Sequence, residues 1–280
     1  MEATGNYHEN LAFYFHEEKY PVSIILANKA KKYFQSLGLK SKNDKIDAKG
    51  LAQMGAEQRL PLWKPFSKEI YDLRMLTRYY EQLSNNRTIF MNQLSSIQAG
   101  KYQIEEVING LKRLIADIDS QLKEVKNKID ELVCKDKKMK ERFEKILLIK
   151  VVGQLTLATI IAETNGFELF DNERQLTSYA GYDVIENQSG KRIGKTWISK
   201  KGNSHIRRIM HMPALNVVCF GEDKFVHLYD RIMKRTCIKM KAYISIQRKL
   251  LLLIFTLWKN ECTYDPRWTY FSGNAEKARF

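Results

Sequence analysis

The longest regular pattern in the sequence begins at Ile104 and ends at Leu132, where the chain reads IEEVINGLKRLIADIDSQLKEVKNKIDEL. Apolar residues recur in this stretch at spacings that alternate between four and three residues. They are Ile104, Ile108, Leu111, Ile115, Ile118, Leu122, Val125, Ile129 and Leu132. A helix places residues with this spacing on one narrow stripe, which is typical of a coiled-coil seam. We therefore predict a long helix whose stripe packs against a coiled-coil partner, either within the chain or in another subunit.

A second helical stripe precedes the first. Ser67 is a residue type that caps the start of helices, and the apolar positions that follow it have helical spacing. They are Ile70, Leu73, Leu76, Tyr80, Leu83, Phe90, Leu94 and Ile97. Gly100 separates the two stripes, so the chain can turn back on itself there. We predict a long antiparallel coiled-coil hairpin over residues 67–143.

Residues 1–66 alternate between helical and strand patterns. Helical patterns flank a β-branched run from Pro21 to Leu26, which is typical of a strand. A single strand cannot pair its own backbone groups, so its sheet is completed either by another chain or by strands upstream of Met1. We predict an α/β segment here.

The rest of the chain is mostly helical in pattern. Apolar runs on either side of Gly153 predict a helix, a turn and a second helix. A polar and basic stretch follows over residues 187–203, which we expect to be a flexible loop, and then a long helical remainder. We predict a helical C-terminal domain over residues 144–262 and a loosely held tail over residues 263–280. The predicted fold class is therefore α/β followed by mostly α.

Composition limits the class of protein. The chain has 280 residues, of which 44% are hydrophobic and 28% are charged, as in soluble globular proteins. Its formal net charge of +15 favours binding to a polyanion, either nucleic acid or a membrane surface. The most apolar run, Leu250 to Trp258, is too short to cross a bilayer, and we interpret it as a core helix. No signal-peptide pattern follows Met1, so we expect a cytoplasmic protein.

Three acidic residues are candidates for metal binding. Glu2 lies in the stretch Met-Glu-Ala-Thr-Gly, and Asp44 and Asp47 are three residues apart at a predicted helix start, so their carboxylates share one side. Mg²⁺ binds through such carboxylates together with phosphate oxygens, and metal pairs activate oxygens in phosphoryl transfer. The two aspartates also suit helix capping and compensation of the helix dipole, so the spacing leaves both interpretations open.

One serine lies in the most basic stretch of the chain. Between Asn187 and Arg208, seven residues are Lys or Arg and none is acidic. The seven are Lys191, Arg192, Lys195, Lys200, Lys201, Arg207 and Arg208. Glycines among them let the backbone approach a phosphate closely. Ser189 could act as a nucleophile if it were held against a phosphodiester among these cations, and the alternative is an ordinary turn serine in a solvated basic loop.

A third group of cations lies on the C-terminal helical pattern. Its members are Lys234, Arg235, Lys239, Lys241, Arg248 and Lys249. They flank apolar positions such as Ile232 and Leu251. We interpret this region as an amphipathic packing layer whose basic edges extend the electropositive surface.

These motifs resemble those of a known family, the transposases of the insertion-sequence 110 type, which are related to the Piv and MooV DNA invertases. The N-terminal Met-Glu-Ala-Thr-Gly-Asn-Tyr resembles the family's Glu-Ala-Thr-Gly motif, and Asn-Asp-Lys-Ile-Asp-Ala, which holds Asp44 and Asp47, resembles its paired aspartates. An ordered series of motifs resembles the family's C-terminal transposase domain. The series is Leu148 to Gly166, Tyr179-Ala180-Gly181, Ser189-Gly190 and Ile198 through Ala214. The similarity extends over nearly the whole chain.

The resemblance implies a RuvC-like (RNase H-like) domain with four acidic metal ligands, a coiled coil used in oligomerisation, and a domain that contributes a serine nucleophile. It implies Glu2, Asp44 and Asp47 as catalytic ligands of Mg²⁺, Ser189 as the nucleophile, and the seven cations near that serine as nucleic-acid contacts. DNA and a guide RNA are the implied partners, and a dimer or tetramer formed through the coiled coil is the implied assembly.

One feature departs from the family. Its first aspartate lies on an opening strand upstream of the Glu-Ala-Thr-Gly motif, whereas this chain begins one residue before that glutamate. We therefore expect residues 1–66 to be a truncated RuvC-like segment that binds divalent metal poorly, and we expect the chain not to recombine DNA unaided.

The leading hypothesis is a transposase that catalyses strand exchange of an insertion sequence, guided by RNA and impaired by the truncation. The alternative is a non-enzymatic, nucleic-acid-binding oligomer, an inactive remnant of such an enzyme. A peripheral membrane protein is disfavoured, because the basic residues cluster in a Gly-rich stretch and not along one face of a helix.

Overall fold

A computed structural model describes residues 1–3, 5–38, 43–190, 192–194, 196–220 and 223–265. It divides the chain into two compact units, Met1–Phe66 and Ser67–Phe280, and each is described by itself. Lys191 and Lys195, two of the seven cations between Asn187 and Arg208, lie outside the described residues, as does most of the predicted tail. The side chain of Arg192 is also outside them.

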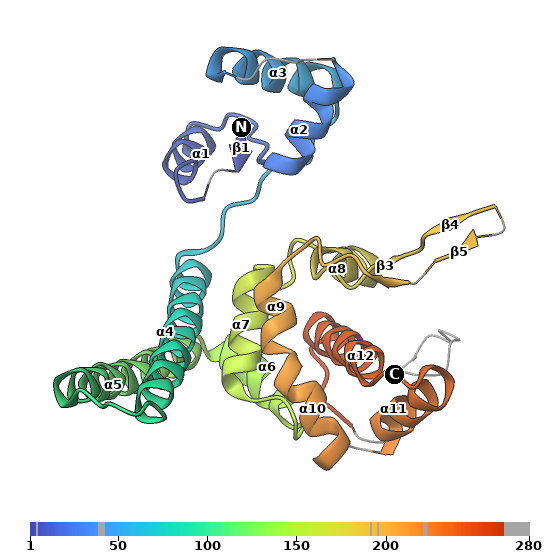
Figure 1. The fold of residues 1–280 in the computed structure, drawn as a ribbon. Coiled ribbons are helices and arrows are strands. Elements are labelled where there is room, and N and C mark those ends of the chain that lie inside the picture. The colour runs from blue at the N-terminus through green and yellow to red at the C-terminus, as the bar shows by residue number, and fades with distance from the viewer. Residues whose placement is uncertain (4, 39–42, 191, 195, 221–222, 266–280) are drawn as a thin grey trace. The chain divides into compact units, whose positions relative to one another are not determined.

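The N-terminal unit is mostly helical. Its elements in chain order are β1 (Glu2–Ala3), α1 (Glu9–Glu17), β2 (Ile25–Leu26), α2 (Ala27–Ser36) and α3 (Asp44–Glu57) (Figure 1). The two strands pair in parallel, with Glu2 opposite Ile25 and Ala3 opposite Leu26. The described residues of this unit form no further strands, so a RuvC-like sheet stays a prediction.

The predicted strand from Pro21 to Leu26 is shorter than expected, because its first residues pair with neighbours outside a regular ladder. The carbonyl oxygen of Ser23 accepts a hydrogen bond from the Met1 amino group at 2.8 Å, and that of Val22 accepts from the Trp63 N–H at 2.7 Å. The backbone groups of this run thus find some of their hydrogen-bond partners within the unit, where the sequence analysis expected strands from elsewhere.

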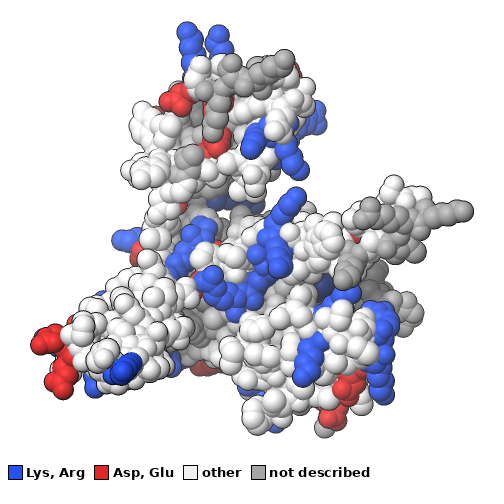
Figure 2. Space-filling model, in the orientation of Figure 1, with Lys and Arg blue, Asp and Glu red and all other residues white. Residues whose placement is uncertain are grey.

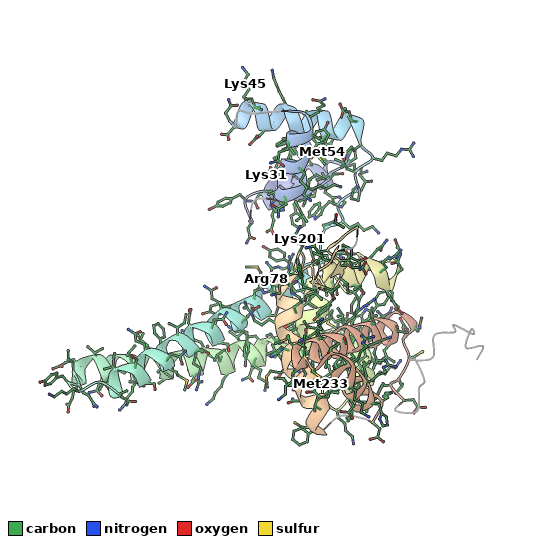
Figure 3. The ribbon with its side chains drawn as sticks, turned by 45° about the vertical axis from the view of Figure 1, so that its right-hand side comes forward. Lys31, Lys45, Met54, Arg78, Lys201 and Met233 are labelled. Atoms are coloured by element: carbon green, nitrogen blue, oxygen red, sulfur yellow. The ribbon has the colours of Figure 1, made fainter. Side chains whose placement is uncertain are left out.

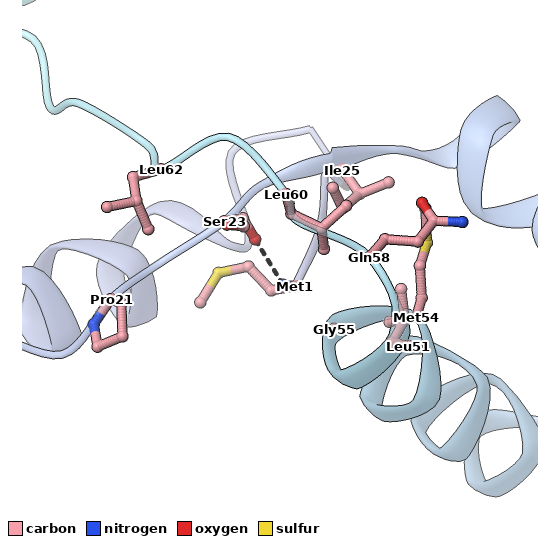
Figure 4. Close-up of a pocket in the computed structure, with 10 residues that line it drawn as sticks. All are labelled: Met1, Pro21, Ser23, Ile25, Leu51, Met54, Gly55, Gln58, Leu60 and Leu62. Atoms are coloured by element: carbon pink, nitrogen blue, oxygen red, sulfur yellow. Dashed lines mark hydrogen bonds between the residues drawn. The ribbon is translucent and has the colours of Figure 1, made fainter.

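The core of the N-terminal unit lies between β2, α2 and α3. It buries Ile25, Ala30, Tyr33 and Met54. A cavity of about 360 Å³ adjoins it, and Figure 4 shows Met1 at this cavity with Met54 and two other residues of the C-terminal half of α3. That half of the helix therefore packs at the end of the chain where Glu2 lies.

Two helices of 31 residues begin the second unit, α4 (Lys68–Gln98) and α5 (Glu105–Lys135). As predicted, Ser67 caps α4, because its hydroxyl oxygen accepts from the Ile70 N–H at 3.3 Å. Tyr79 donates to Gln121 at 2.7 Å. Farther along α4, Arg87 pairs with Asp119, so α5 runs back along α4 in the antiparallel sense. Supercoiling of the pair stays a prediction.

The stripe on α5 faces inward along most of its length. The structure confirms the burial of Ile108, Leu111, Ile118, Val125 and Ile129. The two ends of the stripe differ from the prediction: Ile104 is 59% exposed where it precedes the first turn, and at the other end Val133 is buried in place of Leu132. An α-helix has 3.6 residues per turn, so a stripe with a period of 3.5 residues drifts slowly around the helix. By the end of α5 the buried position has therefore moved from Leu132 to Val133.

The C-terminal part of this unit is helical, apart from one projecting arm. Its helices are α6 (Lys137–Leu147), α7 (Gln154–Thr164), α8 (Glu173–Tyr179), α9 (Ser204–Ile209), α10 (His211–Phe220), α11 (Asp223–Thr236) and α12 (Lys239–Asn260). Nearly every residue of α7 is buried, and α12 buries almost all of Leu250–Trp258, which confirms the predicted core helix. No described helix is long and apolar enough to span a membrane.

The arm carries Ser189 and is a β-hairpin where the sequence predicted a loop. Strand β3 (Val184–Ile185) pairs with β6 (Trp197–Ile198), and β4 (Gln188–Ser189) pairs with β5 (Arg192–Ile193), both antiparallel (Figure 1). Gly190 has φ of +56° in the turn after β4, a conformation that glycine adopts without strain. We call residues 184–198 the serine arm.

The buried stripe of α5 allows a direct test of the core. Replacement of Ile129 by alanine should lower the free energy of unfolding by about 2–4 kcal/mol, because the side chain is 1% exposed and its loss leaves a cavity. The matched replacement of Ile104, which is 59% exposed, should change it by less than about 0.5 kcal/mol. Urea denaturation measures both, and equal losses would contradict the packing described for α4 and α5.

Candidate functional site

A buried carboxylate lies at the root of the serine arm. The side chain of Glu163, near the end of α7, has no exposed surface, and Arg78 of α4 binds both of its oxygens at 2.6 and 2.9 Å. A second arginine of α4, Arg74, lies 3.6 Å from the same carboxylate. Burial by itself would raise the pKa of Glu163, but the hydrogen bonds and charges of the arginines outweigh it and hold this pKa below its ordinary value. The carboxylate is therefore ionised at neutral pH.

The same carboxylate holds the return strand of the arm. Asn203 follows the arm, and its amide nitrogen donates to Glu163 at 2.6 Å. The side-chain oxygen of Asn203 caps α9, since it accepts from the N–H groups of His205 and Ile206 at 2.9 and 3.2 Å. On the outgoing side, the Tyr179 hydroxyl donates to the backbone oxygen of Glu163 at 2.9 Å. Both ends of the arm are thus attached to one residue of α7.

Arg207 fastens the two ends of the arm to each other. Its guanidinium donates to the carbonyl oxygens of Ala180, Asn203 and Lys200, at 2.8, 3.2 and 3.1 Å. The sequence predicted that Arg207 contacts nucleic acid, and the structure gives it this structural role as well.

Glycine is required where the two ends of the arm meet. A Cβ atom at Gly202 would lie 2.3 Å from the carbonyl oxygen of Tyr179, closer than any side chain could fit. Gly181 has φ of +74°, and a Cβ atom there would meet Arg207 at 2.7 Å. The Tyr-Ala-Gly and Lys-Gly-Asn motifs, which begin 22 residues apart in the sequence, are therefore packed backbone against backbone.

A second acidic residue, Glu81 of α4, binds α9. Glu81 contacts His205 Nδ1 at 2.5 Å and also pairs with Arg208. Burial, the largest influence, lowers the pKa of His205. A cavity of about 270 Å³ lies among these three side chains and the neighbouring residues of α7. The sequence predicted that Arg208 contacts nucleic acid. The structure pairs it with Glu81, which balances part of its positive charge within the protein.

The exposed cations of the site gather on one face. Lys200 and Lys201 are exposed next to the root of the arm. In the space-filling view of Figure 2, Lys and Arg side chains gather over α4, α7 and α9. Figure 3 labels Arg78 and Lys201, which belong to this part of the unit. This face combines exposed positive charge with a framework held by Glu163, an arrangement that is compatible with binding of a phosphate backbone.

Ser189 lies toward the tip of the arm and is exposed. It pairs with Arg192 across the turn at Gly190. Its hydroxyl is therefore accessible to a large substrate, and the protein positions it through the arm's backbone and root.

The structure does not gather the three candidate metal ligands into one group. Asn43 caps α3 by accepting from the Ile46 N–H at 2.8 Å, which puts Asp44 and Asp47 in the first turn. Glu2 lies beside the other end of this helix, near Met54, which is about 15 Å farther along at 1.5 Å per residue. Among the described residues no three His, Cys, Asp or Glu side chains could hold a metal ion together. Asp44 and Asp47, without Glu2, still offer a pair of the hard oxygen donors that suit Mg²⁺.

Sequence reasoning did not find the Glu163 network. The residues that it missed are Arg74, Arg78, Glu81 and Glu163, and it gave Asn203 and Tyr179 no part in such a network. One signal was available: Glu163 is the one charged residue between Gln154 and Thr164 in an otherwise apolar helix. A lone carboxylate in such a helix predicts a buried partner of opposite charge.

Comparison with known proteins gives matches over both units. Residues 144–230 match the profile of the transposase family IS116/IS110/IS902, and residues 1–102 match a second transposase profile, that of the DEDD transposases of IS110 type. A pilin gene-inverting protein of Moraxella bovis is 30% identical over 273 residues, which are 95% of this chain and 81% of that protein. The corresponding protein of Moraxella lacunata has the same identity and coverage. The transposase for insertion sequence element IS1111A of Coxiella burnetii is 23% identical over 213 residues, 68% of this chain and 57% of that protein.

Loss of Arg78 tests the buried ion pair. The Arg78→Ala variant leaves a buried charge with weaker partners, so its free energy of unfolding should fall by about 3 kcal/mol near neutral pH. The exposed pair of Lys140 and Glu144, 3.9 Å apart, provides the control: Lys140→Ala should cost less than about 0.5 kcal/mol.

The loss of unfolding free energy caused by Arg78→Ala should depend on pH. Because the pKa of Glu163 is lowered in the folded protein, the ion pair stabilises the fold above the ordinary value of 4.5, and this contribution is lost as the pH falls through the folded pKa. The difference between wild type and Arg78→Ala should therefore shrink in acid. A difference independent of pH in urea denaturation would contradict the assignment.

Proposed function

We propose that this chain, which belongs to the IS116/IS110/IS902 family of transposases, exchanges DNA strands with Ser189 as the nucleophile. The observation that carries the proposal is the serine arm, in which an exposed serine extends from a root that a buried ion network fixes. A nucleophile on such an arm can reach a phosphodiester that is too large to enter a closed pocket, while its backbone stays oriented.

The chemistry that we assign to Ser189 is a transesterification. Its Oγ attacks the phosphorus of a DNA phosphodiester and forms a new P–O bond, while the bond from phosphorus to one deoxyribose oxygen breaks. The proton of the serine hydroxyl goes to solvent, and the released deoxyribose oxygen takes up a proton. Attack by a hydroxyl of another strand on the phosphoserine then rejoins DNA and restores the serine. The number of phosphodiester bonds is unchanged, so no energy source is needed.

The cations around the arm support this assignment. Lys200 and Lys201 are exposed, and Arg192 lies opposite Ser189 in the hairpin. With Lys191, Lys195, Arg207 and Arg208, these residues would bind the phosphate backbone and stabilise negative charge on the reacting phosphate.

The acidic residues of the N-terminal unit form the second part of the proposal. Asp44 and Asp47 would hold a divalent cation such as Mg²⁺ together with phosphate oxygens, and the cation, when bound, would neutralise phosphate charge. Glu2 would join them only after a change in position, because it lies beside the opposite end of α3.

Two further partners belong to the proposal, a guide RNA and other copies of this chain. We propose a guide RNA, on the basis of the resemblance, and a homo-oligomer formed through α4 and α5. These helices leave apolar side chains exposed, among them Met75, Ile89, Met91 and Leu114, which could pack against another subunit.

The separation of Glu2 from the aspartates favours a second candidate, a nucleic-acid-binding oligomer without strand-exchange activity. Such a protein would keep the basic face and the helical hairpin, and Ser189 would have no chemical role. The two candidates differ in one measurable property, the dependence of recombination on the serine hydroxyl.

The test is a recombination assay in cells that carry the DNA ends and the transcript of the element. Because this chain is expected not to recombine DNA unaided, wild type and variants are compared in a form that is extended N-terminally by the family's opening strand with its aspartate. Ser189→Ala should reduce recombination to background, because the hydroxyl is the attacking group, and should leave salt-sensitive DNA binding unchanged. The control is Ser96→Ala, an exposed serine on α4, which should recombine like wild type. Recombination by the Ser189→Ala variant would reject the nucleophile, and loss of DNA binding would show a structural role instead.

A further inference from the structure

A second group of cations lines a groove between the last two helices. The groove has a volume of about 440 Å³. Its walls carry Arg231 and Arg235 from α11 and Arg248 and Lys249 from α12, together with Ser245. Every charged residue that lines it is therefore positive. The sequence suggested only that the basic edges of these helices extend the positive surface.

The fold of the two helices explains why the cations converge. Leu228 and Ile232 of α11 are buried at the base of the groove, so this face of α11 is turned toward α12. Arg231 and Arg235 are one helical turn apart and about 6 Å along the axis, so they stand on the same edge of that face. The α12 residues project from the other side. Packing of apolar residues thus brings together positive charges that repel one another.

The three arginines of the groove have no carboxylate partner among the residues that the structure describes. They are Arg231, Arg235 and Arg248, and their side chains are exposed. Asp230 adjoins Arg231 in the sequence but does not line the groove. In Figure 2, Lys and Arg side chains lie over α11 and α12, near the right-hand edge of this face. An uncompensated cluster of this kind is stabilised by an external polyanion.

We infer that this groove binds the phosphodiester backbone of a nucleic acid, as a site separate from the serine arm. Guanidinium groups bind phosphate oxygens through two parallel hydrogen bonds, and three arginines from two helices suit a run of phosphates more than a single one. The Ser245 side chain adds a polar group to the wall. The cations are recessed between two helices and do not lie on one flat amphipathic face, which distinguishes the groove from a membrane-binding surface.

None of these residues belongs to the arm or to its root. The inference goes beyond the proposed function, because it assigns a further nucleic-acid contact to α11 and α12, and it does not require Ser189 to act as a nucleophile. Strand exchange involves more nucleic acid than the one strand that is cut, and the groove would hold such an additional segment, either DNA or RNA.

Salt dependence of binding tests the inference. The triple variant Arg231→Ala, Arg235→Ala, Arg248→Ala of the full chain would be compared with wild type on a fluorescent DNA duplex and on a single-stranded RNA. Each lost phosphate contact lowers the slope of log K against log salt by about 0.9 on duplex DNA and by about 0.7 on a single strand. We expect the triple variant to lower the slope by two to three on at least one probe, and the probe affected identifies the ligand.

Three controls make the result specific. The first is Lys112→Ala, Lys126→Ala, Lys128→Ala, which removes the same charge from exposed positions on α5 and should leave the slope within about 0.5 of wild type. The second replaces the three arginines by lysine, which should keep most of the slope and shows that the fold is intact. The third is Ser189→Ala, which should bind like wild type whether or not it recombines.

Two outcomes would overturn the inference. One is a groove variant that changes the slope no more than the α5 control does. The other is a loss of binding confined to vesicles of anionic phospholipid, with no change on DNA or RNA, which would assign the groove to a membrane surface.

Discussion

The buried carboxylate of Glu163 is the constraint on which the C-terminal unit depends. An ionised group without exposed surface must be paired, or its burial would be strongly destabilising. Here the partners come from α4, through Arg78 and Arg74, and from the end of the serine arm, through Asn203. The position of α4 on α7 and the position of the arm on α7 are therefore fixed by the same group. A change in one of these contacts affects the others.

This arrangement separates a rigid root from an accessible tip. The root is held by hydrogen bonds to buried or backbone atoms and by glycines at contacts where no side chain fits. The tip carries Ser189 in the open. A strand-exchange enzyme needs both properties, because its nucleophile must be oriented, yet the nucleic acid must enter and leave. The α11–α12 groove adds positive charge away from the arm, so the nucleic acid can be held at more than one place.

The sequence predicted the features that depend on local pattern. The periodicity of apolar residues predicts the two long helices, and Ser67 predicts the cap of the first one. The apolar run from Leu250 predicts a core helix. The features it missed depend on distant partners. Glu163 lies 85 residues from Arg78 and 40 from Asn203, and no spacing rule connects them. The sequence predicts a loop where the arm lies, because strands of two residues are too short to show alternation. The resemblance implies that the three acidic residues lie together, but Asp44 and Asp47 are at the start of α3 and Glu2 is beside its other end.

Hydrogen exchange in solution tests most directly whether Glu163 and Arg78 hold the arm. The backbone N–H groups of Asn203 and Lys200 donate to the carbonyls of Tyr179 and Gly181, so they should be protected in the wild-type protein. In the Arg78→Ala variant they should exchange much faster, while the amides at the centre of α5 keep their protection. Unchanged exchange at the root of the arm in that variant would contradict the account, since the arm would then be held by something other than the buried ion pair.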